Sequence, residues 1–159
     1  MSETIDAPAD TLARACASAM WKTDNVCQEL GVEILEVRQG YAQLAMTLSA
    51  AMANGHGLAH GGYIFTLADA AFAYACNTYD ERTVAAHCSI TYLRPGRIGQ
   101  RLTAVAREVV RAGRSGIYDV TVFDGDETIA EFRGHSRLIG GAILAKPNGS
   151  GENKAGEET

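Results

Sequence analysis

The sequence predicts an α+β fold in which a curved antiparallel sheet of about six strands wraps around one long central helix. Residues 60–78 place apolar side chains on nearly every helical face, which is typical of a helix enclosed on all sides. Other runs alternate apolar and polar residues and are separated by glycines, as antiparallel strands are. So few helices among so many strands exclude a doubly wound sheet, which needs a helix between successive strands.

The first element expected is a short helix over residues 10–21. Asp10 and Thr11 are capping types, and the residues after them space apolar side chains helically. This helix would pack against the rest of the fold or act as a lid. We assign residues 1–31 to an N-terminal helical segment.

Two strands are expected next, over residues 32–39 and 41–49, with Gly40 in the turn between them. A loop of small residues then leads to the central helix, which starts at His60. Four strand-like runs follow, punctuated by glycines: residues 83–95, 101–113, 115–125 and 127–140.

The pair Asp124-Gly125 is a strong signal for a two-residue hairpin loop. The main domain is therefore assigned to residues 32–142. Residues 143–159 are polar, rich in glycine and without periodicity, so we expect a disordered tail.

Composition restricts the class of protein. The chain of 159 residues suits one domain, and its net charge of −5 without basic runs argues against nucleic acid as a partner. No apolar stretch is long and uninterrupted enough for a membrane span, and no secretory signal opens the chain. Its four cysteines lack the spacing of a zinc site or a disulfide framework, which favours a cytoplasmic location.

Asp69 is the one charged residue between Gly61 and Tyr79. A buried carboxylate must be paired, hydrogen-bonded, protonated or used in chemistry, so a structural role and a catalytic role are both open. At the start of the same helix, Gly61 and Gly62 expose backbone N–H groups at the positive end of the helix dipole, which is an outline of an oxyanion hole. Glycine pairs are common, so helix entry alone also explains them.

The spacing of these two features predicts an oligomer. Eight residues separate Gly61 from Asp69, about 12 Å of helix, which is too far for both to act on one carbonyl. If both are catalytic, a second copy must set its helix antiparallel to the first, so that Asp69 of one subunit meets Gly61 of the other. The site would then require at least a homodimer.

One group of residues carries a family resemblance: Asn54, His60-Gly61-Gly62, Phe65, Leu67-Ala68-Asp69 and the run AFAYACN at 71–77. Over roughly residues 10–140 the chain resembles hotdog-fold acyl-CoA thioesterases, and within them the PaaI type, the phenylacetic acid degradation thioesterases. The resemblance implies the hotdog fold, a dimer whose sheets join edge to edge, and often a homotetramer. It also implies hydrolysis of an acyl-CoA, most specifically phenylacetyl-CoA or a ring-hydroxylated phenylacetyl-CoA.

The resemblance assigns roles to individual residues. Asp69 is the nucleophile or the general base that activates water, the Gly61 N–H binds the thioester oxygen, and Asn54 orients the reacting groups. His60 supports the loop or the substrate carbonyl, although packing and capping explain it equally well. Coenzyme A is part of the substrate, so no separate cofactor is expected.

Other parts of the expected site are less direct. Gly62 and Phe65 would contact the substrate, and aromatic residues of the helix would either line an acyl pocket or fill the core: Tyr63, Phe65, Phe72 and Tyr74. Arginines at strand ends would hold the nucleotide of coenzyme A or be ordinary solvated surface: Arg94, Arg97, Arg111 and Arg114.

The family often has a hydroxyl next to the acid or one turn beyond it, but here Ala70 and Ala73 stand there, leaving Thr66 or Thr78 as substitutes. His56 and His60 lie four apart, yet Gly57 argues against a helix between them, so no metal is expected. Two other functions stay open. One is hotdog-fold hydratase or dehydratase chemistry, and the other is a non-enzymatic acyl-CoA-binding module.

Overall fold

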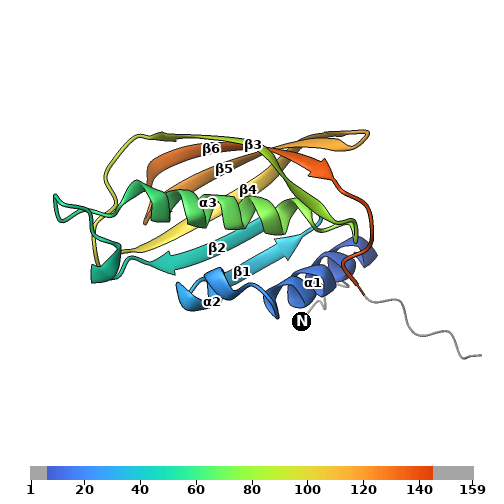
Figure 1. Cartoon of the computed structure of the whole chain (residues 1–159), viewed down its shortest axis with the longest axis horizontal. Coiled ribbons are helices and arrows are strands. Elements are labelled where there is room, and N and C mark those ends of the chain that lie inside the picture. Colours follow the sequence, from blue (N-terminus) through green and yellow to red (C-terminus); the bar gives the residue numbers. More distant parts are fainter. Residues whose placement is uncertain (1–6, 145–159) are drawn as a thin grey trace, which may run out of the picture.

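The computed structural model describes residues 7–144 and confirms the predicted α+β architecture. Six antiparallel strands form a single sheet in the order β1-β2-β4-β5-β6-β3, and the longest helix, α3, crosses one face of it (Figure 1). The elements are α1 (Pro8–Trp21), α2 (Asn25–Glu29), β1 (Glu33–Arg38), β2 (Tyr41–Thr47), the short 3-10 helix η1 (Ala50–Met52), α3 (Gly61–Cys76), β3 (Thr83–Tyr92), β4 (Arg101–Ala112), β5 (Ser115–Asp124) and β6 (Glu127–Leu138).

Helix α1 begins earlier than predicted. Pro8 takes the first helical position, where its missing N–H costs nothing, so Asp10 and Thr11 lie inside the helix and do not cap it. The Asp10 carboxylate instead accepts the Gln39 N–H at 3.0 Å, which ties α1 to the turn between β1 and β2. Buried Ala17 belongs to the same hydrophobic core as α3, so α1 packs against the rest of the fold.

Both predicted hairpins exist, but one loop is shifted. Gly40 has φ +67° in the β1–β2 turn, as expected for a turn glycine. At the other hairpin Asp124 pairs with Glu127, so the loop is Gly125-Asp126, one residue later than predicted. Gly125 has φ +60° and therefore occupies the first loop position.

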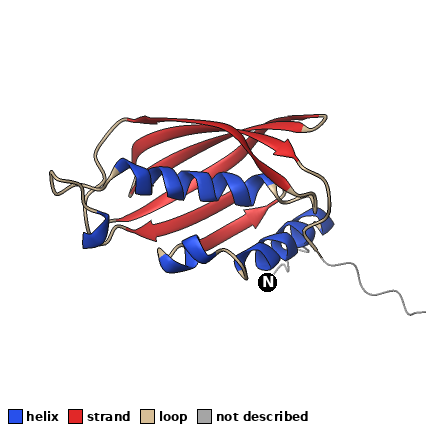
Figure 2. Cartoon of the chain, in the orientation of Figure 1, coloured by secondary structure: helices blue, strands red, loops and turns tan. Residues whose placement is uncertain are grey.

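Helix α3 is not enclosed on all sides, and that expectation is wrong for the described chain. The sheet covers one face, where residues such as Leu67, Ala68 and Ala71 are fully buried. Along the opposite face runs a partly exposed row that we call the open stripe, made of Gly62, Phe65, Thr66, Asp69 and Ala73. Figure 2 shows the reason, since the strands form one layer and no helix or strand of residues 7–144 lies over the outer side of α3.

A glycine sets how closely α3 approaches the sheet. A Cβ on Gly134 of β6 would lie 2.8 Å from three ring carbons of Phe72, closer than real contacts allow. The Phe72 ring occupies that space and packs against the rings of Tyr118 and Phe132, with centroids 5.6 and 5.8 Å away. The height of α3 above the sheet is therefore fixed three residues beyond Asp69.

The sheet ends in an edge strand with exposed apolar side chains. β3 pairs only with β6, and Val84 and Tyr92 of β3 and the adjacent Leu93 are between 44% and 52% exposed. An unpaired edge of this kind is a surface on which another strand can add.

The chain stays ordered past the predicted start of the tail at 143. The backbone N–H groups of Ile143 and Leu144 both donate to the Asp80 carboxylate, at 2.9 and 2.8 Å. The remainder of the predicted tail lies outside the described residues. No helix within residues 7–144 is long and apolar enough to cross a bilayer.

Candidate active site

His60 caps the N-terminus of α3. Its φ of −64° and ψ of 129° are extended, and its Nδ1 accepts the Gly62 N–H at 3.1 Å. The Gly61 N–H has no acceptor among residues 7–144. This free donor stands at the positive end of the helix dipole, where a negative oxygen is stabilised.

A cavity of about 410 Å³ opens beside this helix end, and Asn54, Gly61, Tyr92 and Arg94 help to line it. The Asn54 side-chain oxygen accepts the N–H groups of His56 and Leu58, at 2.9 and 3.2 Å, so it shapes the loop that leads into α3. The structure therefore brings together three of the predicted site residues, Asn54, Gly61 and Arg94.

Tyr92 covers part of the helix entrance. Its hydroxyl donates to the Gly61 carbonyl at 2.8 Å, and its ring lies 3.0 Å from where a Gly61 Cβ would stand. The 61–62 peptide is thus held by Tyr92 on its carbonyl and by His60 on its N–H. The neighbouring peptide, which carries the Gly61 N–H, keeps that donor free.

Asp69 lies halfway along the open stripe. Burial raises the pKa of its carboxyl above the ordinary value, and a hydrogen bond from the Cys88 thiol lowers it in part. The Cys88 Sγ is 3.8 Å from Asp69 Oδ1. A carboxylate with a raised pKa is a better base than a solvated one, because less of its charge is offset by water.

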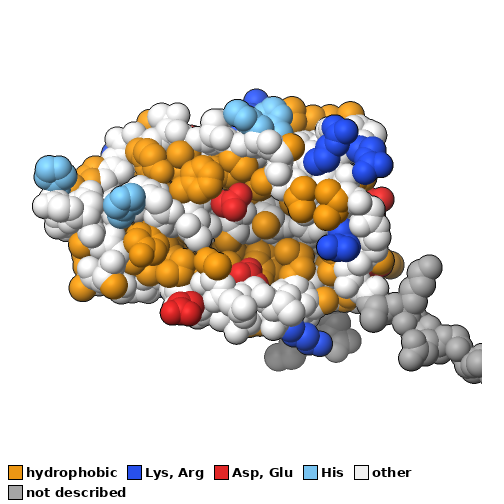
Figure 3. Space-filling view, in the orientation of Figure 1, with side chains coloured by type: hydrophobic (Ala, Val, Ile, Leu, Met, Phe, Trp, Pro, Cys, Tyr) orange, Lys and Arg blue, Asp and Glu red, His pale blue; other side chains and the backbone are white. Residues whose placement is uncertain are grey.

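Within one chain the acid and the free N–H remain apart. Asp69 is not among the residues that line the cavity beside Gly61, and both groups lie on one rigid helix. Figure 3 shows the side of the molecule that carries α3, where hydrophobic side chains surround isolated acidic groups. This face and the β3 edge are exposed in a single chain.

The four predicted arginines divide between two ends of the fold. Arg94 lines the cavity beside Gly61 and pairs with Glu127 at 2.9 Å, and Arg97, whose side chain is 66% exposed, lies close by. Arg111 and Arg114 lie instead at the C-terminal end of α3. One chain therefore does not form the single arginine cradle that the sequence suggested.

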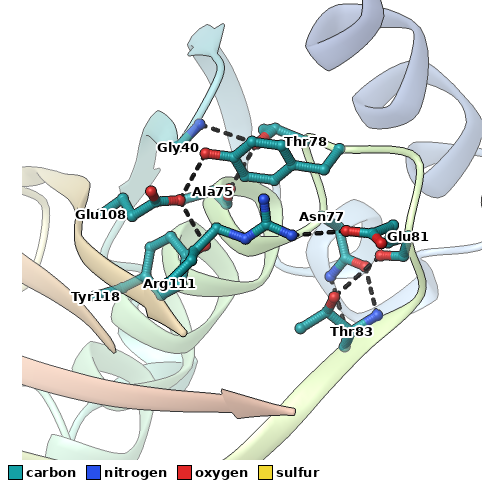
Figure 4. Close-up of polar contacts among 10 residues, drawn as sticks. Gly40, Ala75, Asn77, Thr78, Glu81, Thr83, Glu108, Arg111 and Tyr118 are labelled. Carbon is teal, nitrogen blue, oxygen red and sulfur yellow. Dashed lines mark hydrogen bonds and ion pairs between the residues drawn. The ribbon is translucent and has the colours of Figure 1, made fainter. Parts of the chain in front are cut away.

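Arg111 belongs to a polar network at that end of α3 (Figure 4). Its guanidinium pairs with Glu81 at 2.6 Å and lies 3.7 Å above the Tyr79 ring centroid. The hydroxyls of Tyr79 and Tyr118 both donate to Glu108 Oε2, at 2.7 and 2.9 Å. The Arg111 guanidinium is therefore held between Glu81 and the Tyr79 ring.

The aromatic residues of α3 mainly fill the core. Phe72 is buried, and buried Tyr74 donates its hydroxyl to Asp24 at 3.0 Å, so neither lines an open pocket. Phe65 differs, because it lies on the open stripe with its ring 5.5 Å from Phe132. Tyr63 is partly buried against the core.

Both candidate hydroxyl helpers donate their protons to carbonyls of α3, so neither donates to Asp69. Thr66 donates to the Gly62 carbonyl at 2.9 Å, and Thr78 donates to the Ala75 carbonyl at the same distance. Thr78 is also fully buried and accepts the Gly40 N–H. Instead the polar neighbour of Asp69 comes from β3, as Cys88.

Sequence reasoning missed Cys88 and Tyr92. Both belong to β3, whose alternating pattern indicates a strand but not which side chains meet α3. Within residues 7–144 no group of three or more His, Cys, Asp or Glu side chains is placed to hold an ion.

The sequence and the fold are similar to those of known proteins. The family model described as the thioesterase superfamily matches residues 56–131. The chain is 44% identical over 131 residues to the acyl-coenzyme A thioesterase PaaI of Escherichia coli, which covers 82% of this chain and 94% of that protein.

Two solved structures extend the comparison. The E. coli PaaI protein from the phenylacetic acid degradation operon matches with a TM-score of 0.83 and 41% identity, over 84% of this chain and 98% of that one. A mutant of the phenylacetic acid degradation protein PaaI from Thermus thermophilus matches with a TM-score of 0.71 and 36% identity, over 73% of this chain and 100% of the other.

Proposed function

The chain belongs to the thioesterase superfamily and is an acyl-CoA thioesterase, and we propose that its substrate is phenylacetyl-CoA or a ring-hydroxylated phenylacetyl-CoA. The products would be the free acid and coenzyme A. Support for this acyl group comes from the E. coli relative, whose structure is described as a protein of the phenylacetic acid degradation operon. Sequence similarity to a thioesterase also favours hydrolysis over hydratase chemistry and over binding without turnover.

One observation carries the assignment of the site: Asp69 is a half-buried carboxylate with a raised pKa on the uncovered face of α3. Burial of a charged group without an ionic partner costs stability, so a carboxylate kept in that setting is a candidate for catalysis. We infer that a second copy covers the open stripe with its own α3, antiparallel to the first. Asp69 of one subunit would then face the free Gly61 N–H of the other.

Each group then has a defined part in the reaction. The Gly61 N–H donates to the thioester oxygen and stabilises the negative charge that develops there. Asp69 either attacks the carbonyl carbon and expels the coenzyme A thiolate, leaving a mixed anhydride that water hydrolyses, or takes a proton from water as the water attacks. Asn54 orients the thioester at the cavity, with His60 holding the helix entrance.

The cavity beside Gly61 suggests where the nucleotide enters. Arg94 and Arg97 are basic residues at this end of one chain, while Arg111 and Arg114 of the partner would approach it in an antiparallel pair of helices. Guanidinium groups suit phosphates because they donate in a fixed planar fork. Gly62 and Phe65, both on the open stripe, would lie against the acyl group.

We propose a homodimer as the minimal active unit, joined through the β3 edges, and a homotetramer as the complete assembly in the cytoplasm. Exposed Val84, Tyr92 and Leu93 beside the unpaired edge support the first step. The four free cysteines are consistent with a reducing compartment.

The decisive experiment measures loss of thioester absorbance with purified protein and phenylacetyl-CoA. Direct absorbance is preferable to a thiol reagent, because the protein has four free cysteines of its own. Hydrolysis should fall at least about a hundredfold in Asp69→Ala, since the only carboxylate of α3 is removed. A fully active Asp69→Ala variant would refute the site, and faster turnover of aliphatic than of phenylacetyl thioesters would refute the substrate.

A further inference from the structure

The Asp69 carboxylate has one hydrogen-bond partner within residues 7–144, the thiol of Cys88. Cys88 lies on β3, the edge strand, and reaches Asp69 from a different element across a separation of 19 residues. At 3.8 Å the sulfur is within the range of a thiol hydrogen bond. The contact therefore connects the proposed catalytic acid to the strand at which two subunits would meet.

Cys88 is a thiol and not a thiolate in this setting. Burial raises its pKa to about 11, and the negative charge of Asp69 and the hydrogen bond to it act in the same direction. A protonated sulfur has its hydrogen available to donate. The same property makes Cys88 a poor nucleophile and a poor redox sensor, since only the thiolate reacts readily.

Within residues 7–144 no cation contacts the Asp69 carboxylate. The titratable groups that respond to its charge are Cys27 of α2, Cys76 of α3 and Cys88 of β3, and burial keeps the pKa of all three thiols high. Only burial and Cys88 influence the pKa of Asp69 itself. Glu108 and Tyr118, on the strands packed beneath α3, bond to one another and not to Asp69.

Resting on the proposed function, we propose that Cys88 is a positioning residue for the thioesterase reaction. Its S–H donates to Asp69 Oδ1 and keeps the carboxylate directed along the open stripe, where the thioester or water is attacked. The thiol thereby supplies a polar contact to Asp69 that a hydroxyl could otherwise make. Ala70 and Ala73 have no hydroxyl, and Thr66 and Thr78 donate theirs to helix carbonyls.

Three variants separate this role from simple packing. Cys88→Val keeps a similar volume and suits a strand but removes the donor, whereas Cys88→Ser keeps a donor. Cys16→Ala is the matched control, because Cys16 is a buried thiol of α1 whose pKa responds to Asp80 and not to Asp69. Thermal unfolding of each variant establishes that it is folded before kinetics are compared.

The valine variant should lose about tenfold in kcat for phenylacetyl-CoA with little change in KM, because a hydrogen bond to a charged group contributes on that scale. The acid limb of its pH profile should move to higher pH, since the bond that lowers the pKa of Asp69 is gone. Cys88→Ser should recover most of the loss, and Cys16→Ala should behave as the unmodified protein. Equal kcat in the valine and serine variants, or an acid limb that does not move, would overturn the proposal.

A second measurement keeps this proposal distinct from the proposed function. Carbon-13 NMR titration of the Asp69 carboxyl reports its pKa without any substrate. If the unmodified protein hydrolyses no acyl-CoA, the proposed function fails, but the Asp69 midpoint should still be higher in Cys88→Val than in Cys88→Ser. Equal midpoints would eliminate the Cys88 contact whatever the activity.

Discussion

Replacing Gly61 with proline should remove the oxyanion donor while leaving α3 intact. Gly61 is the first residue of α3, a position at which proline is well tolerated because its N–H would bond to nothing within the helix. The preceding His60 has φ −64° and ψ 129°, within the region that a residue before proline prefers. The substitution therefore deletes one N–H without a cost to the backbone conformation.

Gly61→Ala is the matched control. Both residues add a Cβ, which would lie 3.0 Å from the Tyr92 ring, and alanine keeps the N–H. Any displacement of the Tyr92 ring is therefore common to both variants. The difference between the two variants isolates the contribution of the N–H.

Loss of one oxyanion donor costs about a hundredfold to a thousandfold in kcat, or about 2.7–4 kcal/mol of transition-state stabilisation. Gly61→Pro should therefore hydrolyse phenylacetyl-CoA at least about a hundredfold more slowly than Gly61→Ala, with similar thermal unfolding temperatures. The assay is thioester absorbance under saturating substrate. Equal rates in the proline and alanine variants would show that the Gly61 N–H does not bind the thioester oxygen.

Two further predictions concern stability. Asp69→Asn should abolish hydrolysis yet raise the unfolding temperature at neutral pH. A buried carboxyl with a raised pKa stabilises the fold only while it is protonated, and this stabilisation is lost as pH rises through the pKa of the folded state. In calorimetry the gain should shrink as pH is lowered toward 4, and a gain independent of pH would contradict the reasoning. Gly134→Ala should destabilise the protein by about 2 kcal/mol, since its Cβ would lie 2.8 Å from the Phe72 ring, whereas Gly55→Ala, with open space around it, should be nearly neutral. Denaturation in urea measures both variants, and a stable Gly134→Ala would show that Phe72 does not fix the height of α3.

The sequence predicted the elements well because their signals are local. The apolar run after His60 fixed the type of α3, and a histidine followed by two glycines marked its start. Alternation and turn glycines located all six strands, and Gly40 marked one hairpin correctly. At the β5–β6 hairpin the prediction placed Asp124 in the loop, whereas Asp124 pairs with Glu127 and the loop is one residue later.

Features that depend on which elements meet could not be predicted in the same way. Helical periodicity shows that α3 is apolar on most faces. It does not show which of these faces the sheet covers, because an alanine such as Ala73 fits the pattern whether it lies against the sheet or faces solvent. The four arginines all stand near strand ends, and only the order of strands reveals that Arg94 and Arg111 lie at opposite ends of α3. Cys88 gave no signal, since a thiol in an alternating strand is ordinarily a core residue.

The central claim is that one subunit supplies Asp69 and its partner supplies Gly61, and mixing two inactive variants tests it most directly. Asp69→Ala and Gly61→Pro are unfolded together at equal concentrations, refolded to exchange subunits, and assayed with phenylacetyl-CoA. Half of the dimers would be mixed, and each would contain one intact site and one doubly altered site, so activity should return to about a quarter of that of the unmodified protein. No recovery, in a sample shown to contain mixed dimers, would contradict a site shared between subunits.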